Sequence, residues 1–227
     1  MSARVVLLHG MGLSRRMWRA QLEALADRYE LVAPDLPGHG QAPGPFRIDT
    51  AVGVVRELLA EAPAYLVGVS LGGTVAVRAA LAEPAKVEGL LLSGTPARMS
   101  KRLLLAQRAI TAVLPPANLA ATGLRIVRPA DRRDADNYLA DVLAAGRETQ
   151  SDAMRELGRV DLTPRLGEIT ARTLVCCGSE DDTNLASVRA LSAAVPGAEL
   201  RIVEGGGHLW NLQQPDLCTR IIADFVG

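Results

Sequence analysis

The 227-residue sequence has few aromatic residues, no net charge and no long apolar run, and each shortage excludes a class of protein. Aromatic side chains make up 3% of the chain, too few for a surface that stacks nucleic-acid bases. The 25 basic and 25 acidic residues cancel, so the overall charge gives no support for binding nucleic acid or an anionic membrane. No apolar stretch approaches the roughly 18 residues that a membrane-spanning helix needs. We therefore expect neither a nucleic-acid partner nor a membrane partner.

Cysteine is scarce too, and its placement gives no sign of a disulfide or a metal site. Cys176 and Cys177 are adjacent in an apolar run, Cys218 stands alone, and no Cys/His cluster has zinc spacing. We expect three small buried side chains in a reducing compartment, and no metal or other cofactor. The N-terminal stretch "MSARVVLLHGMG" lacks the long apolar segment and cleavage site of a signal peptide, which predicts a cytoplasmic protein.

What the chain does contain is a series of short apolar runs with helical patterns between most of them. Six runs are predicted strands: 4–8, 30–33, 64–69, 87–92, 172–177 and 199–203. They are continuously apolar, which is typical of parallel strands covered on both faces. Strands alternating with helices predict an α/β fold with a doubly wound, mostly parallel sheet of about six strands.

Helix signals and a long insertion complete the predicted architecture. Ser14 can cap a helix over 15–27, and Pro215 stands where the last helix would begin. Between the fourth and fifth strands, residues 96–171 show helical patterns and no convincing strand. A strand–helix–strand connection needs far fewer residues, so we expect a core of residues 1–95 and 166–227 with a helical lid at 96–165.

One stretch, "AYLVGVSLGGTVAV" (64–77), places Ser70 between a predicted strand and a predicted helix, with glycines on both sides. Gly-x-Ser-x-Gly at such a junction forms a nucleophile elbow, a sharp turn that lifts the hydroxyl clear of the sheet. The helix that begins at Leu71 adds backbone N–H groups and a positive dipole end, which stabilise an oxyanion. The motif alone is common, so a nucleophile and an incidental serine in a glycine-rich turn both remain open.

A nucleophilic serine needs a base, and the base needs an orienting group. His9 and His39 lie in turns that precede the serine, whereas His208 follows the predicted strand 199–203 in a glycine-rich loop. The candidates for the orienting acid follow strand 172–177 and are Glu180, Asp181 and Asp182. Carboxyl ends of parallel strands meet at one edge of a sheet, so serine, acid and histidine can converge there.

Taken together, the motifs resemble those of the α/β-hydrolase superfamily over nearly the whole chain outside 96–160. "HGMG" resembles its oxyanion loop, "DLPGHG" the loop after the next strand and "GVSLGG" the nucleophile elbow. "GSED" resembles the acid loop and "GGGH" the histidine loop. The resemblance implies the fold already predicted from the pattern, with the long insertion acting as a lid.

The resemblance also implies catalytic roles. Ser70 would be the nucleophile, His208 the general base and then acid, and Asp181 the residue that orients the imidazolium, since the family spacing from Gly178 favours it over its two acidic neighbours. The oxyanion donors would be the backbone N–H groups of Met11 and Leu71, beside Gly10. His9 and His39 would shape loops.

This chain departs from the family pattern in two places. It lacks the two strands that often open the fold, which leaves strand 30–33 at the sheet edge and makes a monomer or a weak homodimer the expectation. Gln213 stands where relatives frequently have a glutamate. Neither departure touches the three catalytic candidates.

The sequence restricts the identity of the substrate less than it restricts the fold and the catalytic residues. Gly10, Trp210 and Tyr138, the only aromatic residue of the lid, are candidates for the pocket wall, and the other apolar lid residues are aliphatic. Residues 97–165 carry twelve basic and eight acidic side chains, so the lid could attract an anionic or carrier-linked acyl substrate, although solvated helix faces explain these charges as well.

Three functions follow from these observations. The first is a serine hydrolase for a small carboxylic ester, thioester or lactone, as in the small bacterial esterases and enol-lactonases that share "DLPGHG". The second is a lyase resembling the menaquinone-pathway enzyme that eliminates pyruvate, although Thr74 replaces an arginine of that enzyme. The third is a non-catalytic protein that uses the hydrolase pocket for binding.

Overall fold

The structure is a computed structural model that describes residues 2–227, with every side chain in that range except that of Leu103. A single six-stranded sheet runs through the molecule in the order β2-β1-β3-β4-β5-β6, with all neighbours parallel. The strands are β1 (Arg4–Leu8), β2 (Glu30–Val32), β3 (Ala64–Val69), β4 (Val87–Ser93), β5 (Arg172–Gly178) and β6 (Glu199–Val203). Each predicted strand is confirmed to within one residue, and β2 does lie at a sheet edge.

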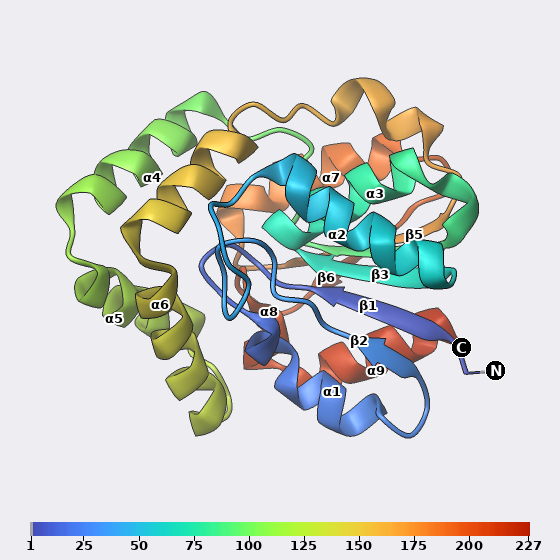
Figure 1. The fold of residues 1–227 in the computed structure, drawn as a ribbon, viewed down its shortest axis with the longest axis horizontal. Helices are drawn as coiled ribbons and strands as arrows, with labels where there is room; N and C mark the ends of the chain where they lie inside the picture. The colour runs from blue at the N-terminus through green and yellow to red at the C-terminus, as the bar shows by residue number, and fades with distance from the viewer. Residues whose placement is uncertain (1) are drawn as a thin grey trace.

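Helices cover both faces of the sheet, which explains why its strands are continuously apolar (Figure 1). Along β1, Val6 and Leu8 belong to the apolar cluster beneath α2 (Ile48–Glu61), α3 (Leu71–Ala82) and α7 (Asp182–Ala194). Val5 and Leu7 belong to the opposite cluster, with α1 (Arg19–Leu25), α8 (Trp210–Gln213) and α9 (Pro215–Val226). Alternate residues of one strand therefore enter two separate cores.

The predicted helix signals act at the positions where they occur. Ser14 accepts a hydrogen bond from the Arg16 amide at 3.2 Å, and the chain turns through η1 (Arg15–Trp18) before α1 begins. The predicted helix at 15–27 is thus a tight turn followed by a short helix that ends at Leu25. Pro215 is the first residue of α9, where its missing N–H costs no hydrogen bond.

The insertion between β4 and β5 is helical. It contains α4 (Lys101–Val113), α5 (Pro116–Val127), α6 (Arg132–Leu157) and the short η3 (Thr163–Glu168). Figure 1 shows α4 and α5 farthest from the sheet, α6 between them and the core, and both chain termini at the opposite end of the molecule. Within residues 2–227, no helix is both long enough and apolar enough to cross a bilayer.

The insertion leaves the core and returns to it at one place. Arg98 and Asp161 form an isolated antiparallel bridge, and the Leu162 amide donates to the Ala97 carbonyl at 2.9 Å. After that point Leu166 and Ile169 pack in the cluster beneath α2 and α3. The two ends of the insertion are therefore anchored side by side above the carboxyl edge of the sheet.

Candidate active site

Ser70 occupies a strained turn between β3 and α3. Its backbone has φ 54° and ψ −111°, a region that residues other than glycine rarely adopt. The turn needs its glycines: a Cβ on Gly72 would press on the Leu8 backbone, and one on Gly68 would lie 2.6 Å from Gly73 Cα. The Ser70 amide donates to the Ser93 carbonyl at 2.8 Å, which ties the turn to the neighbouring strand. The local sequence thus forms the predicted elbow geometry.

His208 and Asp181 meet beside this turn, one after β6 and the other after β5. The imidazole Nδ1 lies 2.8 Å from Asp181 Oδ2, and Asp181 is buried whereas the His208 side chain is 36% exposed. An Nδ1–H donated to the carboxylate leaves Nε2 free to accept a proton. Asn184 completes the group, because its Nδ2 donates to Asp181 Oδ1 at 2.9 Å.

The buried carboxylate is held in its charged form. Burial by itself raises the pKa of Asp181, but the hydrogen bond and charge of His208, together with the donors of Asn184, outweigh burial and lower it. Glu180 and Asp182, the competing acids, are exposed, and Glu180 pairs with Arg128 at 2.9 Å. The structure therefore brings only Asp181, of the three acids, to the histidine.

Gly94 lies directly beside the imidazole, and the sequence analysis did not identify it. Its φ is 55°, and a Cβ at this position would lie 2.9 Å from His208 Nδ1. Its amide donates to the Cys176 carbonyl at 3.0 Å. The sequence signal for this residue is a glycine directly after a strand, in the stretch "SGTP" (93–96).

The two predicted oxyanion donors come from different segments: Met11 lies in the loop after β1, and Leu71 is the first residue of α3. Gly10, Met11 and Leu71 line the same pocket as Ser70, and among the described residues neither the Met11 nor the Leu71 amide donates a hydrogen bond. His9 braces this loop: its Nδ1 lies 2.9 Å from the Gly10 carbonyl, and its Nε2 accepts from the Leu36 amide at 2.9 Å. Two amides without a partner among the described residues therefore belong to residues that line the pocket of Ser70.

Both loop histidines are neutral supports. His9 is completely buried, and burial, with the nearby His39, lowers its pKa to about 3. Burial also lowers the pKa of His39, whose Nδ1 lies 3.0 Å from the Pro37 carbonyl. These contacts agree with the predicted roles in loop shape.

A cavity of about 470 Å³ lies between the sheet edge and the helical insertion. Its floor contains Gly10, Met11, Ser70, Leu71 and His208. Its ceiling contains Met99, Ile126, Val127, Val142 and Leu157 as apolar residues, with Gln107 and Tyr138 as polar ones. Gly10 and Tyr138, two of the residues predicted at the pocket wall, line this cavity, and most of its ceiling side chains are apolar. That they contact a substrate stays a prediction.

Trp210 does not line this cavity. The side chain is 1% exposed in the core cluster of α9, and its indole N–H donates to Ser93 Oγ at 2.7 Å. A buried indole satisfies its N–H internally, so Trp210 supports the site from below instead of contacting a ligand. Gln213, at the second departure from the family pattern, accepts from the Gly207 amide at 2.7 Å and thereby shapes the loop that carries His208.

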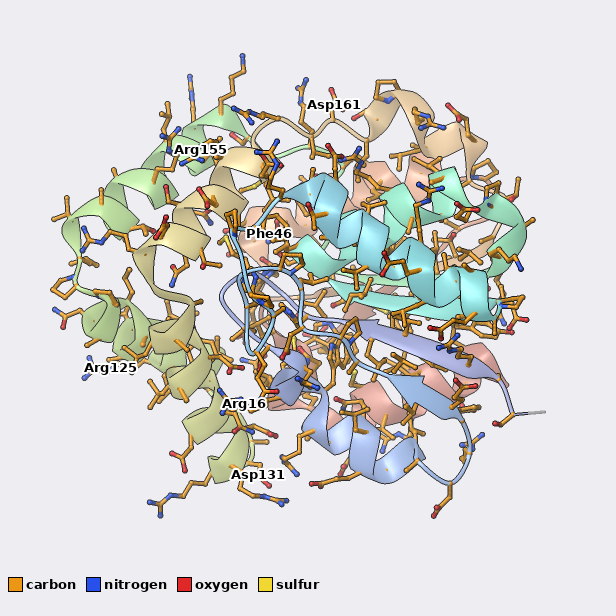
Figure 2. All side chains as sticks on the ribbon, viewed as in Figure 1. Arg16, Phe46, Arg125, Asp131, Arg155 and Asp161 are labelled. Atoms are coloured by element: carbon orange, nitrogen blue, oxygen red, sulfur yellow. The ribbon has the colours of Figure 1, made fainter. Side chains whose placement is uncertain are left out.

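The cationic side chains of the insertion do not face Ser70 either. Among the described residues that line the cavity, no lysine or arginine occurs. Arg125 lies on the outer side of α5 (Figure 2), and with Arg128 it lines a second cavity of about 480 Å³ that meets His208 from another side. The expectation of an anionic acyl group therefore finds no partner in the main pocket.

An ionic clamp joins the insertion to the oxyanion loop. Asp141 of α6 is buried and accepts hydrogen bonds from the Ser14 amide at 3.0 Å and the Ser14 hydroxyl at 2.7 Å. It also accepts from Arg16 Nε at 2.9 Å, and Figure 2 shows Arg16 between α1 and the lower part of α6. A carboxylate among several donors fixes the segment that follows Gly10 and Met11.

Within residues 2–227, no three His, Cys, Asp or Glu side chains are grouped so that they could hold a metal ion. The arrangement of a free hydroxyl, an acid-paired imidazole and two free amides suits transfer of an acyl group through the serine.

Comparison with known proteins gives the class. The profile of the Alpha/beta hydrolase family matches residues 5–221. The chain belongs to this family and is a hydrolase of the α/β fold.

Three similar proteins illustrate the relationship. The chain is 30% identical over 239 residues to a "Putative carbamate hydrolase RutD" of Klebsiella pneumoniae (strain 342), covering 97% of this chain and 90% of that protein. It is 42% identical over 95 residues to the pimeloyl-[acyl-carrier protein] methyl ester esterase of Methylococcus capsulatus, covering 40% of this chain and 37% of that protein. The structure of a thermophilic esterase from Thermogutta terrifontis superposes with a TM-score of 0.85 at 26% identity, over 100% of this chain and 90% of that one.

Proposed function

We propose that this protein is a serine hydrolase that cleaves a small carboxylic ester, thioester or lactone through an acyl-enzyme. The observation that carries the proposal is the strained Ser70 turn, which shares one pocket with His208, itself bonded at 2.8 Å to the buried Asp181. The names of the similar proteins, which include esterases and a carbamate hydrolase, support carbonyl hydrolysis as the reaction class.

The mechanism assigns one role to each group. Ser70 Oγ attacks the carbonyl carbon while His208 Nε2 takes its proton, a step that requires these two atoms to approach to about 3 Å. The Met11 and Leu71 amides hold the oxyanion, each contributing about 3 kcal/mol in sites of this kind. His208 then protonates the leaving group, and water attacks the acyl-enzyme by the same route. Asp181 stabilises the imidazolium throughout.

The helices α4 to α6 are proposed to be a lid that selects the acyl group. They supply the ceiling of the cavity, and most of its side chains are apolar. Apolar ceilings favour aliphatic substrates because binding removes apolar surface from water.

Lyase chemistry of the menaquinone type is less well supported. Such an enzyme binds an anionic substrate through arginines, yet no arginine occurs among the described residues that line this cavity. Thr74 is buried, and its hydroxyl lies 3.4 Å from the Ser70 carbonyl, so it turns inward to the helix.

A burst experiment tests the proposal. Purified protein is mixed with p-nitrophenyl acetate, butyrate and octanoate, and nitrophenolate is followed on the millisecond scale. We expect a burst of one equivalent per active chain, and the Ser70→Ala variant should lose the burst and at least about 10⁴-fold in turnover. Asn211→Ala, a buried change outside the pocket, controls for general loss of structure. A folded wild type with neither burst nor turnover would contradict the proposal.

The dependence of the rate on pH gives a second check. Because only a neutral imidazole accepts the serine proton, kcat/KM should fall on the acid side of its pH profile. A profile without an acid limb would argue against His208 as the base.

A further inference from the structure

The ceiling of the active-site cavity contains an unsatisfied polar group. On α4, the inward positions Leu104, Gln107 and Thr111 follow helical spacing, and Gln107 lines the cavity. Its Oε1 atom is inaccessible to solvent and has no hydrogen-bond partner among the described residues. A buried amide oxygen without a partner is unfavourable, so a ligand that supplies the missing hydrogen bond gains affinity once the Gln107 amide rotates about its last side-chain bond to bring Oε1 to the cavity wall.

The Tyr138 hydroxyl is a second polar atom of the ceiling. Tyr138 lines the same cavity, and its hydroxyl makes no hydrogen bond to any described residue. Burial raises the pKa of Tyr138, so the hydroxyl keeps its proton and can donate as well as accept. The space for it depends on Gly123, since a Cβ there would collide with the Tyr138 hydroxyl. Gly123 thus leaves room for a hydroxyl to which no described residue hydrogen-bonds.

The ceiling holds polar groups but no charges. Apart from Asp181 and His208 on the floor, the described lining contains no Asp, Glu, Lys or Arg. A charged ligand group would therefore lose its hydration there without gaining an ionic partner. An amide or a hydroxyl, by contrast, needs no ionic partner, and Gln107 and Tyr138 both carry groups that hydrogen-bond to it.

His208 borders two cavities, and the second has Arg125, Arg128 and Gly207 in its wall. A leaving group that occupied the second cavity would lie beside the imidazole that must protonate it, with the acyl group in the cavity beneath the ceiling.

We infer that the ceiling is a binding subsite for a neutral hydrogen-bonding group, an amide or a hydroxyl, carried on the acyl chain away from the reacting carbonyl, and that Gln107 selects it. The inference rests on the proposed hydrolase function and specifies its substrate class.

Matched esters test the subsite. One pair is p-nitrophenyl 4-acetamidobutanoate and heptanoate, and a longer pair is 6-acetamidohexanoate and nonanoate; the members of a pair have equal chain length and differ in the amide. In one of the two pairs we expect wild type to prefer the amide ester in kcat/KM. Gln107→Met, which keeps the size of the side chain, should lose about tenfold on that ester, mainly through KM, with little change on its alkyl partner.

Three further variants and one charged substrate test which side chains form the subsite and whether it rejects a charge. Gln107→Asn should retain part of the preference, and Tyr138→Phe should lose about threefold on the amide ester. Thr111→Val, on the inward face of α4 but outside this cavity, should change neither ester. The mono-p-nitrophenyl ester of nonanedioate, which ends in a carboxylate, should be the poorest substrate of its length. A wild type that prefers the alkyl ester in both pairs, or a Gln107→Met that lowers both members of each pair equally, would overturn the subsite while the hydrolysis stands.

Binding separates the subsite from catalysis. The Ser70→Ala protein is titrated calorimetrically with the methyl esters of the same acids, alone and in combination with Gln107→Met. Tighter binding of the amide ester, removed by Gln107→Met, would support the subsite even if no ester were turned over, and only the hydrolase proposal would then fail. Equal affinity for amide and alkyl esters in both pairs would overturn the subsite.

Discussion

At the scale of single residues, burial keeps the ionisable side chain of His9 neutral, and the ring connects two loops through hydrogen bonds. Its two ring nitrogens join the carbonyl of Gly10 to the amide of Leu36, so one imidazole connects the oxyanion loop to the loop after β2. The bonding pattern requires a neutral ring with its proton on Nδ1, and the low pKa keeps it so. The position of the proposed oxyanion donors therefore depends on a histidine that takes no part in proton transfer.

The same residue makes folding stability depend on pH. The folded-state pKa of His9 is about 3, whereas an unfolded histidine titrates near about 6.5, so acid protonates the unfolded chain preferentially. The stability that the neutral ring of His9 contributes is complete above about pH 6.5 and is lost progressively as pH falls toward about 3. Between pH 7 and 4.5 the free energy of unfolding should decrease by about 2–3 kcal/mol from this group alone.

His9→Gln isolates this effect. Urea unfolding measured from pH 7 to 4.5 should show a lower stability at pH 7, because the ring contacts are lost, but a shallower slope, by about one proton, than that of wild type. Parallel curves for the two proteins would show that His9 is not the group that takes up the proton on unfolding.

At the scale of elements, a bend in α6 brings both halves of this helix to the pocket. Gly146 interrupts the helix with φ 63° and ψ −172°. Tyr138 and Val142 from the half before it and Leu157 from the half after it line the same cavity. Only glycine adopts such a backbone conformation without strain. The bend therefore depends on one residue that makes no side-chain contact.

A matched pair of glycine substitutions tests the bend. A Cβ would meet no atom within 4 Å at either Gly146 or Gly53, so the two sites differ in backbone conformation and not in available space. Gly146→Ala should destabilise the protein by about 1–2 kcal/mol, and Gly53→Ala, inside α2, should stabilise it by about 0.5–1 kcal/mol. Thermal unfolding should show midpoint shifts of opposite sign. Equal shifts would contradict a special role for the backbone at position 146.

At the scale of the whole molecule, α6 is fastened to the core while α4 and α5 pack mainly on it. The first half of α6 is held by Asp134, bonded to Arg19 at 2.7 Å, and by Asp141; near its other end, Glu156 accepts from the Ile48 amide at 3.1 Å. By contrast, α4 packs against α6, and α5 packs against α6 and α8. The outer face of α4 even exposes Ile110 and Val113.

This arrangement predicts an order of local opening. In native-state hydrogen exchange, amides of α4 should exchange faster than those of α6, and both faster than those of β3 and β4, because the outer helices have the fewest buried contacts. Labelling Ser70 with an alkyl phosphonate, whose chain would lie beneath the ceiling, should slow exchange in α4 and α5. Equal protection of α4 and α6 in the free protein would contradict an opening lid.

The sequence by itself determined the parts of this protein that depend on neighbouring residues. Apolar runs covered on both faces gave all six strands, and the elbow motif placed Ser70 at a turn whose glycines leave no room for side chains. Asp181 and His208 could be predicted because strand ends gather at one sheet edge whatever the lengths of the connections. Topology brings the acid loop to the histidine loop, and the spacing shared with the α/β-hydrolase family favoured Asp181 over Glu180 and Asp182.

Tertiary structure decided everything that depends on which distant atoms meet. Gly94 beside His208, Gln107 in the ceiling and Asp141 on Ser14 come from segments far apart in the sequence, and no periodicity reports such contacts. For the same reason Trp210, adjacent in sequence to the active-site loop, lies in the core because its indole found a partner on another strand. Position along the chain fixes the secondary structure, whereas three-dimensional packing decides which side chains face the substrate.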